Sequence, residues 1–131
     1  MDCICTTLAN NLLPVLKKYP QIAFAYLFGS VATGEQTVLS DIDIAIFHYY
    51  NSVFSFDDTL QFQGDCCRVL KRNDIDVLVL NKTSNLILLE DVIRNGQIIY
   101  NSAPQLVDDF ELNTLHLVCD FKYQRQREMG A

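Results

Sequence analysis

Two aspartates separated by one residue follow a glycine–serine pair at a distance that suits metal and phosphate chemistry. The pair Gly29-Ser30 is followed by ten residues and then by Asp41-Ile42-Asp43. Apolar runs stand on both sides, at residues 22–28 and 44–47. This order predicts a strand, a glycine turn with a short helix or loop, and a second strand that carries both carboxylates.

The spacing of the two aspartates gives their side chains a common direction. Side chains at positions i and i+2 of a strand point to the same face, about 6.6 Å apart along it. Asp41 and Asp43 therefore face one way, and Ile42, Ile44 and Ile46 face the other way, into a core. Two carboxylates held side by side repel each other unless one is protonated or a cation neutralises both. Mg2+ suits such a site because it prefers oxygen ligands and commonly takes one or two carboxylates plus substrate phosphates.

The glycine–serine pair adds a surface for phosphate. Gly29 has no side chain, so a phosphate group can approach its backbone closely. The Ser30 hydroxyl and the amides that open the following turn can donate hydrogen bonds to that phosphate. Asp-x-Asp alone often caps strands and turns, and Gly-Ser alone usually marks a turn. The two motifs together, at this spacing and between two apolar strands, indicate a metal and phosphate site.

A third carboxylate comes from the run at residues 73–80, which predicts another strand. If this strand lies beside the one that carries Asp43, about 4.8 Å away, Asp76 completes a cluster of three carboxylates around two metal ions. Asp74 has the same parity and is the rival candidate. Its place near the end of the preceding helix is typical of a turn residue, so we favour Asp76.

The segment Phe28-Gly29-Ser30, followed by Ser40-Asp41-Ile42-Asp43, resembles the signature of the DNA polymerase beta-like nucleotidyltransferases. The length and the tail resemble the minimal nucleotidyltransferase (MNT) branch, whose pattern also places an acid directly before an apolar triplet such as residues 77–79. The resemblance covers residues 19–100 and implies the nucleotidyltransferase fold, ATP as substrate and two Mg2+ ions. Members often carry an arginine near the glycine, where this chain has Thr33, so a positive charge that could meet phosphate is missing.

Hydrophobic periodicity predicts the elements that position these residues. We expect helices over residues 3–19, 56–72 and 86–95 and from Pro104 onward, and strands over residues 22–28, 41–47, 73–80 and 97–100. The result is an α/β (α+β) fold in a single domain, residues 1–131, with a small mixed sheet of about 3–4 strands flanked by helices.

Particular residues are expected to shape these helices. Pro14 should kink the first helix or delay its start. Ser55 or Asp57 could cap the second helix, and the third should run from a Ser84 cap to a stop at Gly96. The apolar stripe of the last helix is expected to include Leu106, Phe110, Leu117 and Phe121.

Histidine, cysteine and the clustered cations have structural explanations. His48 follows the second strand in a loop and has no positioned partner, so no catalytic role is assigned to it. The five cysteines are odd in number and are expected to be free thiols. Arg68, Lys71 and Arg72 lie where a helix dipole favours cations, and a phosphate contact is the second interpretation.

Composition argues against several classes of protein. The chain has 131 residues, 16 acidic and 10 basic, and a net charge of -6. Proteins that bind long nucleic acids need a basic stripe, which this sequence lacks. No apolar run approaches the roughly 18 residues that span a bilayer, and the N-terminus lacks the basic start of a secretory signal. We therefore expect a cytoplasmic protein without a membrane or long nucleic-acid partner.

The resemblance to MNT antitoxins implies a partner and an acceptor. In that family the MntA-type antitoxin transfers AMP from ATP to a tyrosine of a HEPN ribonuclease toxin, as part of a type VII toxin–antitoxin pair, and the two proteins form hetero-oligomers. One alternative is a non-catalytic antitoxin that neutralises its partner by contact. Another is a nucleotidyltransferase that acts on a small molecule.

Overall fold

Helices and strands follow one another in the order that the sequence predicts. The structure is a computed structural model that describes residues 3–28 and 42–130, with side chains for residues 7–28 and 42–123. Its elements are α1 (Cys3–Lys18), β1 (Ile22–Phe28), β2 (Ile42–His48), α3 (Phe56–Leu70), β3 (Ile75–Val79), the 3-10 turn η1 (Leu80–Lys82), α4 (Leu86–Asn95), β4 (Gln97–Asn101) and α5 (Pro104–Gly130).

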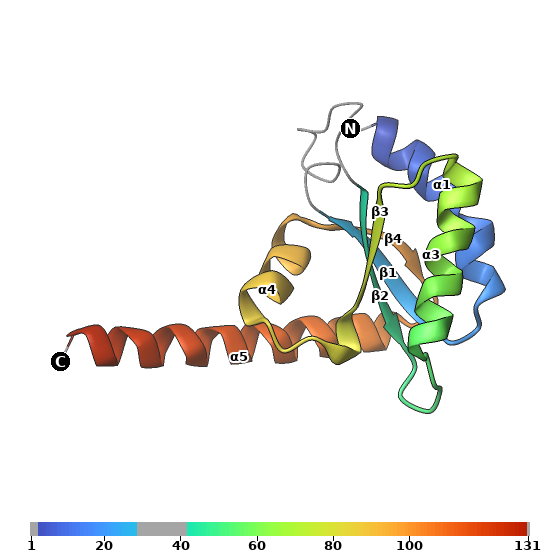
Figure 1. The fold of residues 1–131 in the computed structure, drawn as a ribbon. Coiled ribbons are helices and arrows are strands. Elements are labelled where there is room, and N and C mark those ends of the chain that lie inside the picture. Colours follow the sequence, from blue (N-terminus) through green and yellow to red (C-terminus); the bar gives the residue numbers. More distant parts are fainter. Residues whose placement is uncertain (1–2, 29–41, 131) are drawn as a thin grey trace.

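The strands form one mixed sheet in the order β3-β2-β1-β4. β1 is antiparallel to β2 and β4, whereas β2 and β3 are parallel. The predicted small mixed sheet flanked by helices is therefore confirmed. Because β2 and β3 run the same way and β1 runs opposite to β2, the start of β2, the start of β3 and the end of β1 lie at one end of the sheet (Figure 1).

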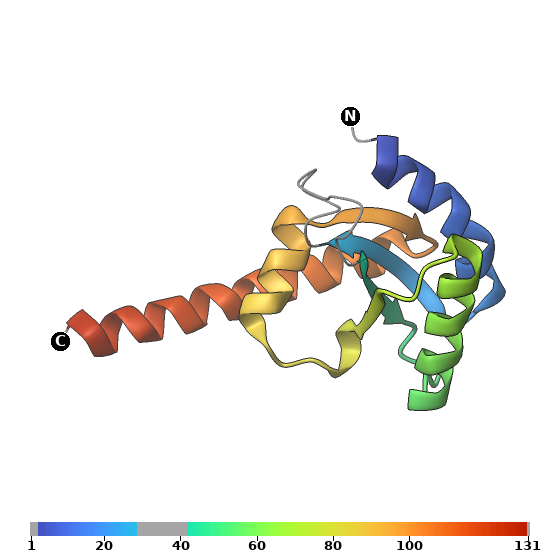
Figure 2. The same cartoon turned by 45° about the horizontal axis from the view of Figure 1, so that its top comes forward.

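Helices cover both faces of the sheet. α1 and α3 lie on one face, where Leu16 and Phe62 pack against strand residues such as Ile44. α4 and α5 lie on the other face, where Val92 and Phe110 pack against strand residues such as Tyr26 and Phe47 (Figures 1 and 2). Since both faces are covered, the two central strands are almost entirely apolar, as expected for strands without a solvated side.

The ends of α3 and α4 each match one prediction and miss another. α1 begins at Cys3 and runs through Pro14, so the proline does not delay its start, and it ends at Lys18, one residue before the predicted end. Ser55 caps α3: its hydroxyl accepts a hydrogen bond from the Asp58 amide at 3.1 Å, and the Asp58 carboxylate accepts one from the Ser55 amide at 2.9 Å. α3 ends two residues earlier than predicted, because Lys71 adopts the left-handed conformation (φ 56°, ψ 43°) and turns the chain toward β3.

The cap predicted for α4 was wrong by one residue. The side chain of Asn85, and not that of Ser84, accepts a hydrogen bond from the Leu88 amide, at 3.2 Å. Gly96 ends α4, as predicted, and its close surroundings explain the residue type. A Cβ atom there would lie 2.3 Å from the Val92 carbonyl oxygen and 3.2 Å from that of Leu27. Glycine therefore allows the end of α4 to approach the end of β1.

α5 spans 27 residues, and its second half extends beyond the sheet (Figures 1 and 2). The predicted apolar stripe is buried at Phe110 but not at Leu117 and Phe121, whose exposed fractions are 54% and 39%. The buried residues instead are Val107, Phe110, Thr114 and Val118. The stripe prediction fails at Leu117 because the buried positions of α5 follow one another at helical spacing, and Leu117 lies outside that face although its neighbour Val118 is buried.

Two smaller expectations can be compared with the described part of the chain. Cys66, Cys67 and Cys119 are free thiols, as predicted. None of the helices in residues 3–28 and 42–130 combines the length and the apolar character that crossing a bilayer requires.

Candidate active site

Two of the predicted carboxylates meet where β2 and β3 begin. Asp43 of β2 is the register partner of Asp76 in the parallel ladder and of Phe28 in the antiparallel ladder with β1. Adjacent strands lie about 4.8 Å apart. Phe28, Asp43 and Asp76 therefore form a row across three neighbouring strands, which we call the carboxylate row.

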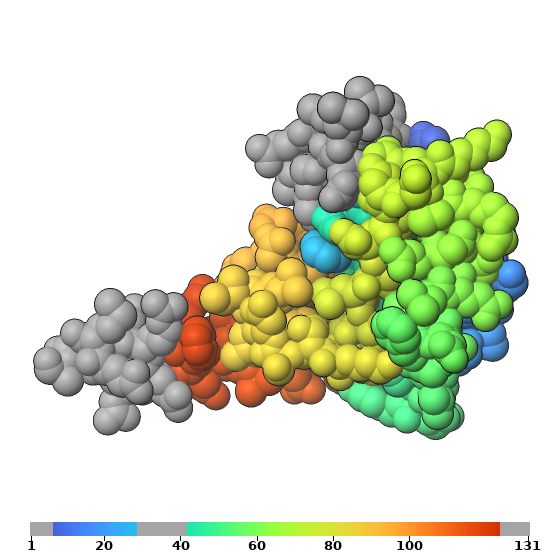
Figure 3. Space-filling model, in the orientation of Figure 1, coloured from blue at the N-terminus to red at the C-terminus, as the bar shows by residue number. Residues whose placement is uncertain are grey.

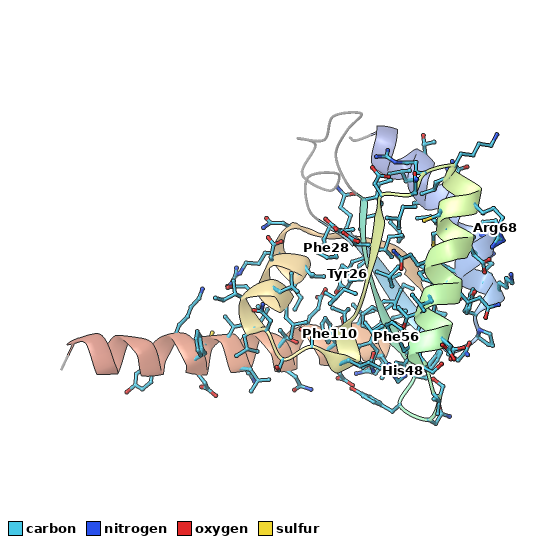
Figure 4. The ribbon with its side chains drawn as sticks, viewed as in Figure 1. Tyr26, Phe28, His48, Phe56, Arg68 and Phe110 are labelled. Carbon is cyan, nitrogen blue, oxygen red and sulfur yellow. The ribbon has the colours of Figure 1, made fainter. Side chains whose placement is uncertain are left out.

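The carboxylate row faces the side of the sheet that α4 and α5 cover. Side chains alternate along a strand, and Tyr26, Ala45 and Leu78, each two positions deeper in the sheet, belong to the core on that side. Figure 4 shows Phe28 nearer this end of the sheet than Tyr26. Asp43 is half-buried and Asp76 is exposed, so the row lies at the boundary between core and solvent.

The same end of the sheet reaches the molecular surface. Figure 3 shows the end of β1 (blue) and the start of β2 (teal) at the surface, between α4 and β3. The end of α4 comes close to the end of β1 at Gly96. One helix end therefore lies near the carboxylate row. A ligand that contacts Asp43 and Asp76 from this side can therefore keep part of its surface in solvent.

The donor chemistry of the carboxylate row fits a hard divalent cation. Two aspartates at paired positions of adjacent strands repel each other, and a cation with oxygen ligands removes that repulsion. In residues 3–28 and 42–130 no group of three or more metal-ligating side chains comes together. Asp41, the third predicted ligand, lies outside the described residues, as do Gly29 and Ser30. The ligand roles of all five residues remain predictions.

Asp74, the rival for the third carboxylate, is engaged by a cation. Arg72 Nε donates a hydrogen bond to Asp74 Oδ1 at 2.8 Å, and a second Arg72 nitrogen donates to Oδ2. This hydrogen bonding holds the pKa of Asp74 below its usual value. Asp74 therefore already has its charge partner, whereas Asp76 stands directly opposite Asp43, and this contrast supports our choice of Asp76.

His48 lies at the other end of β2 from Asp43. The two residues are five positions apart in an extended strand, about 16 Å. The His48 backbone exchanges two hydrogen bonds with the Asn81 side chain, at 3.0 and 3.1 Å, and its ring Nδ1 lies 2.9 Å from the Tyr49 carbonyl oxygen. His48 therefore lies far from the carboxylate row.

Sequence reasoning missed the Arg72–Asp74 pair. Arg72 was first explained by the helix dipole, but α3 ends before it and its side chain binds a carboxylate on the following segment. The available signal for this ion pair was a cation and an acid two residues apart, between a predicted helix and a predicted strand. That signal is weak, because whether the two side chains meet depends on the turn at Lys71.

A known protein family resembles this chain over most of its length. The family model described as polymerase beta, nucleotidyltransferase matches residues 10–105. No curated protein sequence matches this chain significantly.

Solved structures share the fold along almost the whole chain. A chain from the crystal structure of a toxin–antitoxin complex with AMP-PNP is 24% identical, with a TM-score of 0.78 over 93% of this chain and 95% of that chain. A chain of the MntA–HepT toxin–antitoxin complex is 21% identical, with a TM-score of 0.72 over 95% and 96%. A third structure contains the tri-AMPylated Shewanella oneidensis HEPN toxin in complex with MNT antitoxin; its chain is 20% identical, with a TM-score of 0.73 over 96% of each chain.

The matched family region contains the carboxylate row and the glycine–serine segment, together with all of the sheet. It covers well over half of the sequence. The chain therefore belongs to the polymerase beta nucleotidyltransferase family.

Proposed function

We propose that this protein is a Mg2+-dependent nucleotidyltransferase that transfers AMP from ATP to a tyrosine hydroxyl of a HEPN toxin, and so acts as an antitoxin. The observation that carries the proposal is the register of Asp43 opposite Asp76 on two parallel strands. This register puts two carboxylates on one face, at the end of the sheet where the glycine–serine segment leaves β1.

The metal ligands in this proposal are Asp41, Asp43 and Asp76. When bound, two Mg2+ ions would neutralise charge on the triphosphate and raise the reactivity of its α-phosphorus. Gly29 and Ser30 would bind the phosphates through backbone amides and the hydroxyl. Catalysis of this kind depends mainly on positioning and charge neutralisation.

The chemical step needs one proton acceptor. The tyrosine oxygen forms a bond to the α-phosphorus of ATP, the bond to the bridging oxygen breaks, and pyrophosphate leaves with the bond electrons. The hydroxyl proton passes to a carboxylate of the site, and we assign this role to Asp76, because its side chain is exposed on the row that the acceptor would approach.

A protein acceptor is supported by two observations. The structures with the same fold come from toxin–antitoxin complexes, one of them with an AMPylated toxin. In this chain, α5 exposes large apolar side chains on the sides that do not pack against the body, including Leu112 and Leu117 at 56% and 54%. Exposed apolar side chains gathered on one element are typical of a protein contact surface.

Transfer of label from α-32P-ATP to the protein encoded beside this one tests the proposal. Asp43→Asn and Asp76→Asn should each reduce labelling of the partner by roughly 10²-fold or more, as when one group that stabilises the transition state is removed. Asp108→Asn is the matched control, because Asp108 is an exposed aspartate on α5 and its loss changes the net charge by the same amount. Unchanged labelling with both site variants would contradict the proposal.

Neutralisation by contact is the second candidate, and the exposed apolar residues of α5 favour it. The double variant Asp43→Asn/Asp76→Asn separates the two, because it should keep α5 and its exposed surface while losing the carboxylate row. Loss of toxin neutralisation in cells, with the complex still formed, supports transfer. Full neutralisation by the folded double variant supports contact.

A further inference from the structure

Positive charge is unevenly distributed along this chain. All ten lysines and arginines lie outside residues 19–67, so the segment between β1 and β2 contributes no cation to the predicted phosphate site. A triphosphate is strongly anionic, and proteins that bind it generally supply arginine or lysine in addition to the metal. The cation must therefore come from another part of the fold.

Most basic side chains in the described part of the chain have partners elsewhere. Lys18 and Arg68 bind Asp65 on the α1 and α3 side of the sheet, and Figure 4 shows Arg68 on the outer side of α3. Lys82 donates to the Phe54 carbonyl at 2.6 Å. Arg94 and Lys122 both bind Glu90, which joins α4 to α5.

Lys71 and Arg72 both lie at the correct end of the sheet, and Arg72 is held there by its side chain, through Asp74, as well as by its backbone. Its amide donates to the Cys67 carbonyl at 3.0 Å, which fixes it to the last turn of α3. Two residues later, the Asp74 carbonyl accepts a hydrogen bond from the Ile42 amide at 3.0 Å, so the pairing with β2 extends to Asp74. Arg72 therefore stands just ahead of the strand that carries Asp76, beside the start of β2.

The side chain of Arg72 is already oriented. The Asp74 carboxylate accepts two of its N–H groups, and the two side chains are only 25% and 33% exposed. A guanidinium group has five N–H donors in a fixed plane and stays charged at any working pH. A pair of this kind loses little conformational freedom when an anion binds to it.

We infer that Arg72 binds the β- and γ-phosphates of the nucleotide, with Asp74 as the positioning residue that holds its guanidinium beside the carboxylate row. This inference rests on the proposed nucleotidyl transfer, because it names a binding residue of the same site.

Nucleotide binding by the purified protein tests this role without measuring transfer. Displacement of a fluorescent ATP analogue in the presence of Mg2+ gives the affinities for AMP-PNP and for AMP, which lacks the β- and γ-phosphates. Arg72→Gln should lower the affinity for AMP-PNP by about tenfold or more, the loss expected when a charge-assisted hydrogen bond disappears. It should change the affinity for AMP by no more than about twofold. Asp74→Asn should show a smaller loss of the same kind.

Arg68→Gln is the matched control, because it removes the same charge four residues away on the outer side of α3. It should leave the affinity for AMP-PNP unchanged. Arg72→Lys keeps the charge and perturbs the fold least, so it repeats the test if Arg72→Gln does not fold. Arg72→Lys should still lower the affinity for AMP-PNP about threefold, because a lysine cannot make a bidentate contact with phosphate.

Two results overturn the inference while leaving the proposed function intact. One is wild-type affinity for AMP-PNP in a folded Arg72 variant. The other is an equal loss for AMP and AMP-PNP, which would mean a general structural effect. Failure of the wild-type protein to bind AMP-PNP with Mg2+ would overturn the proposed function, and this inference with it.

Discussion

At the scale of single residues, the surroundings of each aspartate decide what it can do. Asp43 and Asp76 stand opposite each other on β2 and β3, with Asp76 exposed. Asp74, close by, is held by Arg72. Asp65 is buried between α1 and α3, where the Tyr19 hydroxyl donates to it at 2.6 Å. The same type of residue thus has three uses in this protein: Asp43 and Asp76 are candidate metal ligands, Asp74 is a positioning group, and Asp65 is a structural anion.

Asp65 gives a residue-scale prediction about stability. The hydrogen bond from Tyr19, followed by those from the cations, holds the pKa of Asp65 below its usual value. Asp65→Asn keeps an acceptor for Tyr19 but loses the charge, so it should lower the free energy of unfolding at pH 7 by about 1–2 kcal/mol. Lys18 and Arg68 are 61% and 72% exposed and should contribute little of this.

The effect of Asp65 should depend on pH with a defined sign. A carboxyl group with a depressed pKa in the folded state stabilises the protein above its unfolded pKa, about 4, and loses that contribution as the pH falls through the folded pKa. The stability difference between wild type and Asp65→Asn, measured by urea unfolding, should therefore be largest at pH 7 and shrink below pH 4. A difference that stays constant down to pH 3 would contradict this account.

At the scale of elements, local sequence signals predicted most of the structure. Apolar composition located β1 at both ends, and the Ser55 and Gly96 signals marked ends of α3 and α4. The predictions missed features that depend on tertiary contacts. The strand predicted from Asn73 begins only at Ile75, because the turn after α3 takes up the first residues. On α5, the face that packs against the body includes Thr114 and Val118 and leaves Leu117 exposed.

The turn between α3 and β3 offers a prediction at the element scale. Lys71 has φ 56° and ψ 43°, a conformation that costs a residue with a Cβ atom more than it costs glycine. Lys71→Gly should therefore raise the free energy of unfolding by about 0.5–1 kcal/mol. Thermal or urea unfolding of the two proteins checks this. A lower stability in the glycine variant would show that the lysine side chain matters more than the backbone conformation.

At the scale of the whole molecule, the sheet order brings distant parts of the sequence into one row. Phe28, Asp43 and Asp76 lie on three strands that are separated in the chain by the glycine–serine segment and by α3. The sequence predicted that the strands of Asp43 and Asp76 would be neighbours. It could not predict that β4 lies on the far side of β1, because strand order depends on how the helices cover the two faces.

The central claim is that Asp43 and Asp76 jointly hold the metal that binds a nucleotide triphosphate. A crystal structure of the protein with AMP-PNP and Mn2+, with the metal located by anomalous scattering, tests it most directly. The account predicts a metal peak within coordination distance, about 2 Å, of a carboxylate oxygen of each residue and of a phosphate oxygen. A metal and nucleotide bound away from the carboxylate row, with Asp43 and Asp76 both making no contact to either, would contradict it.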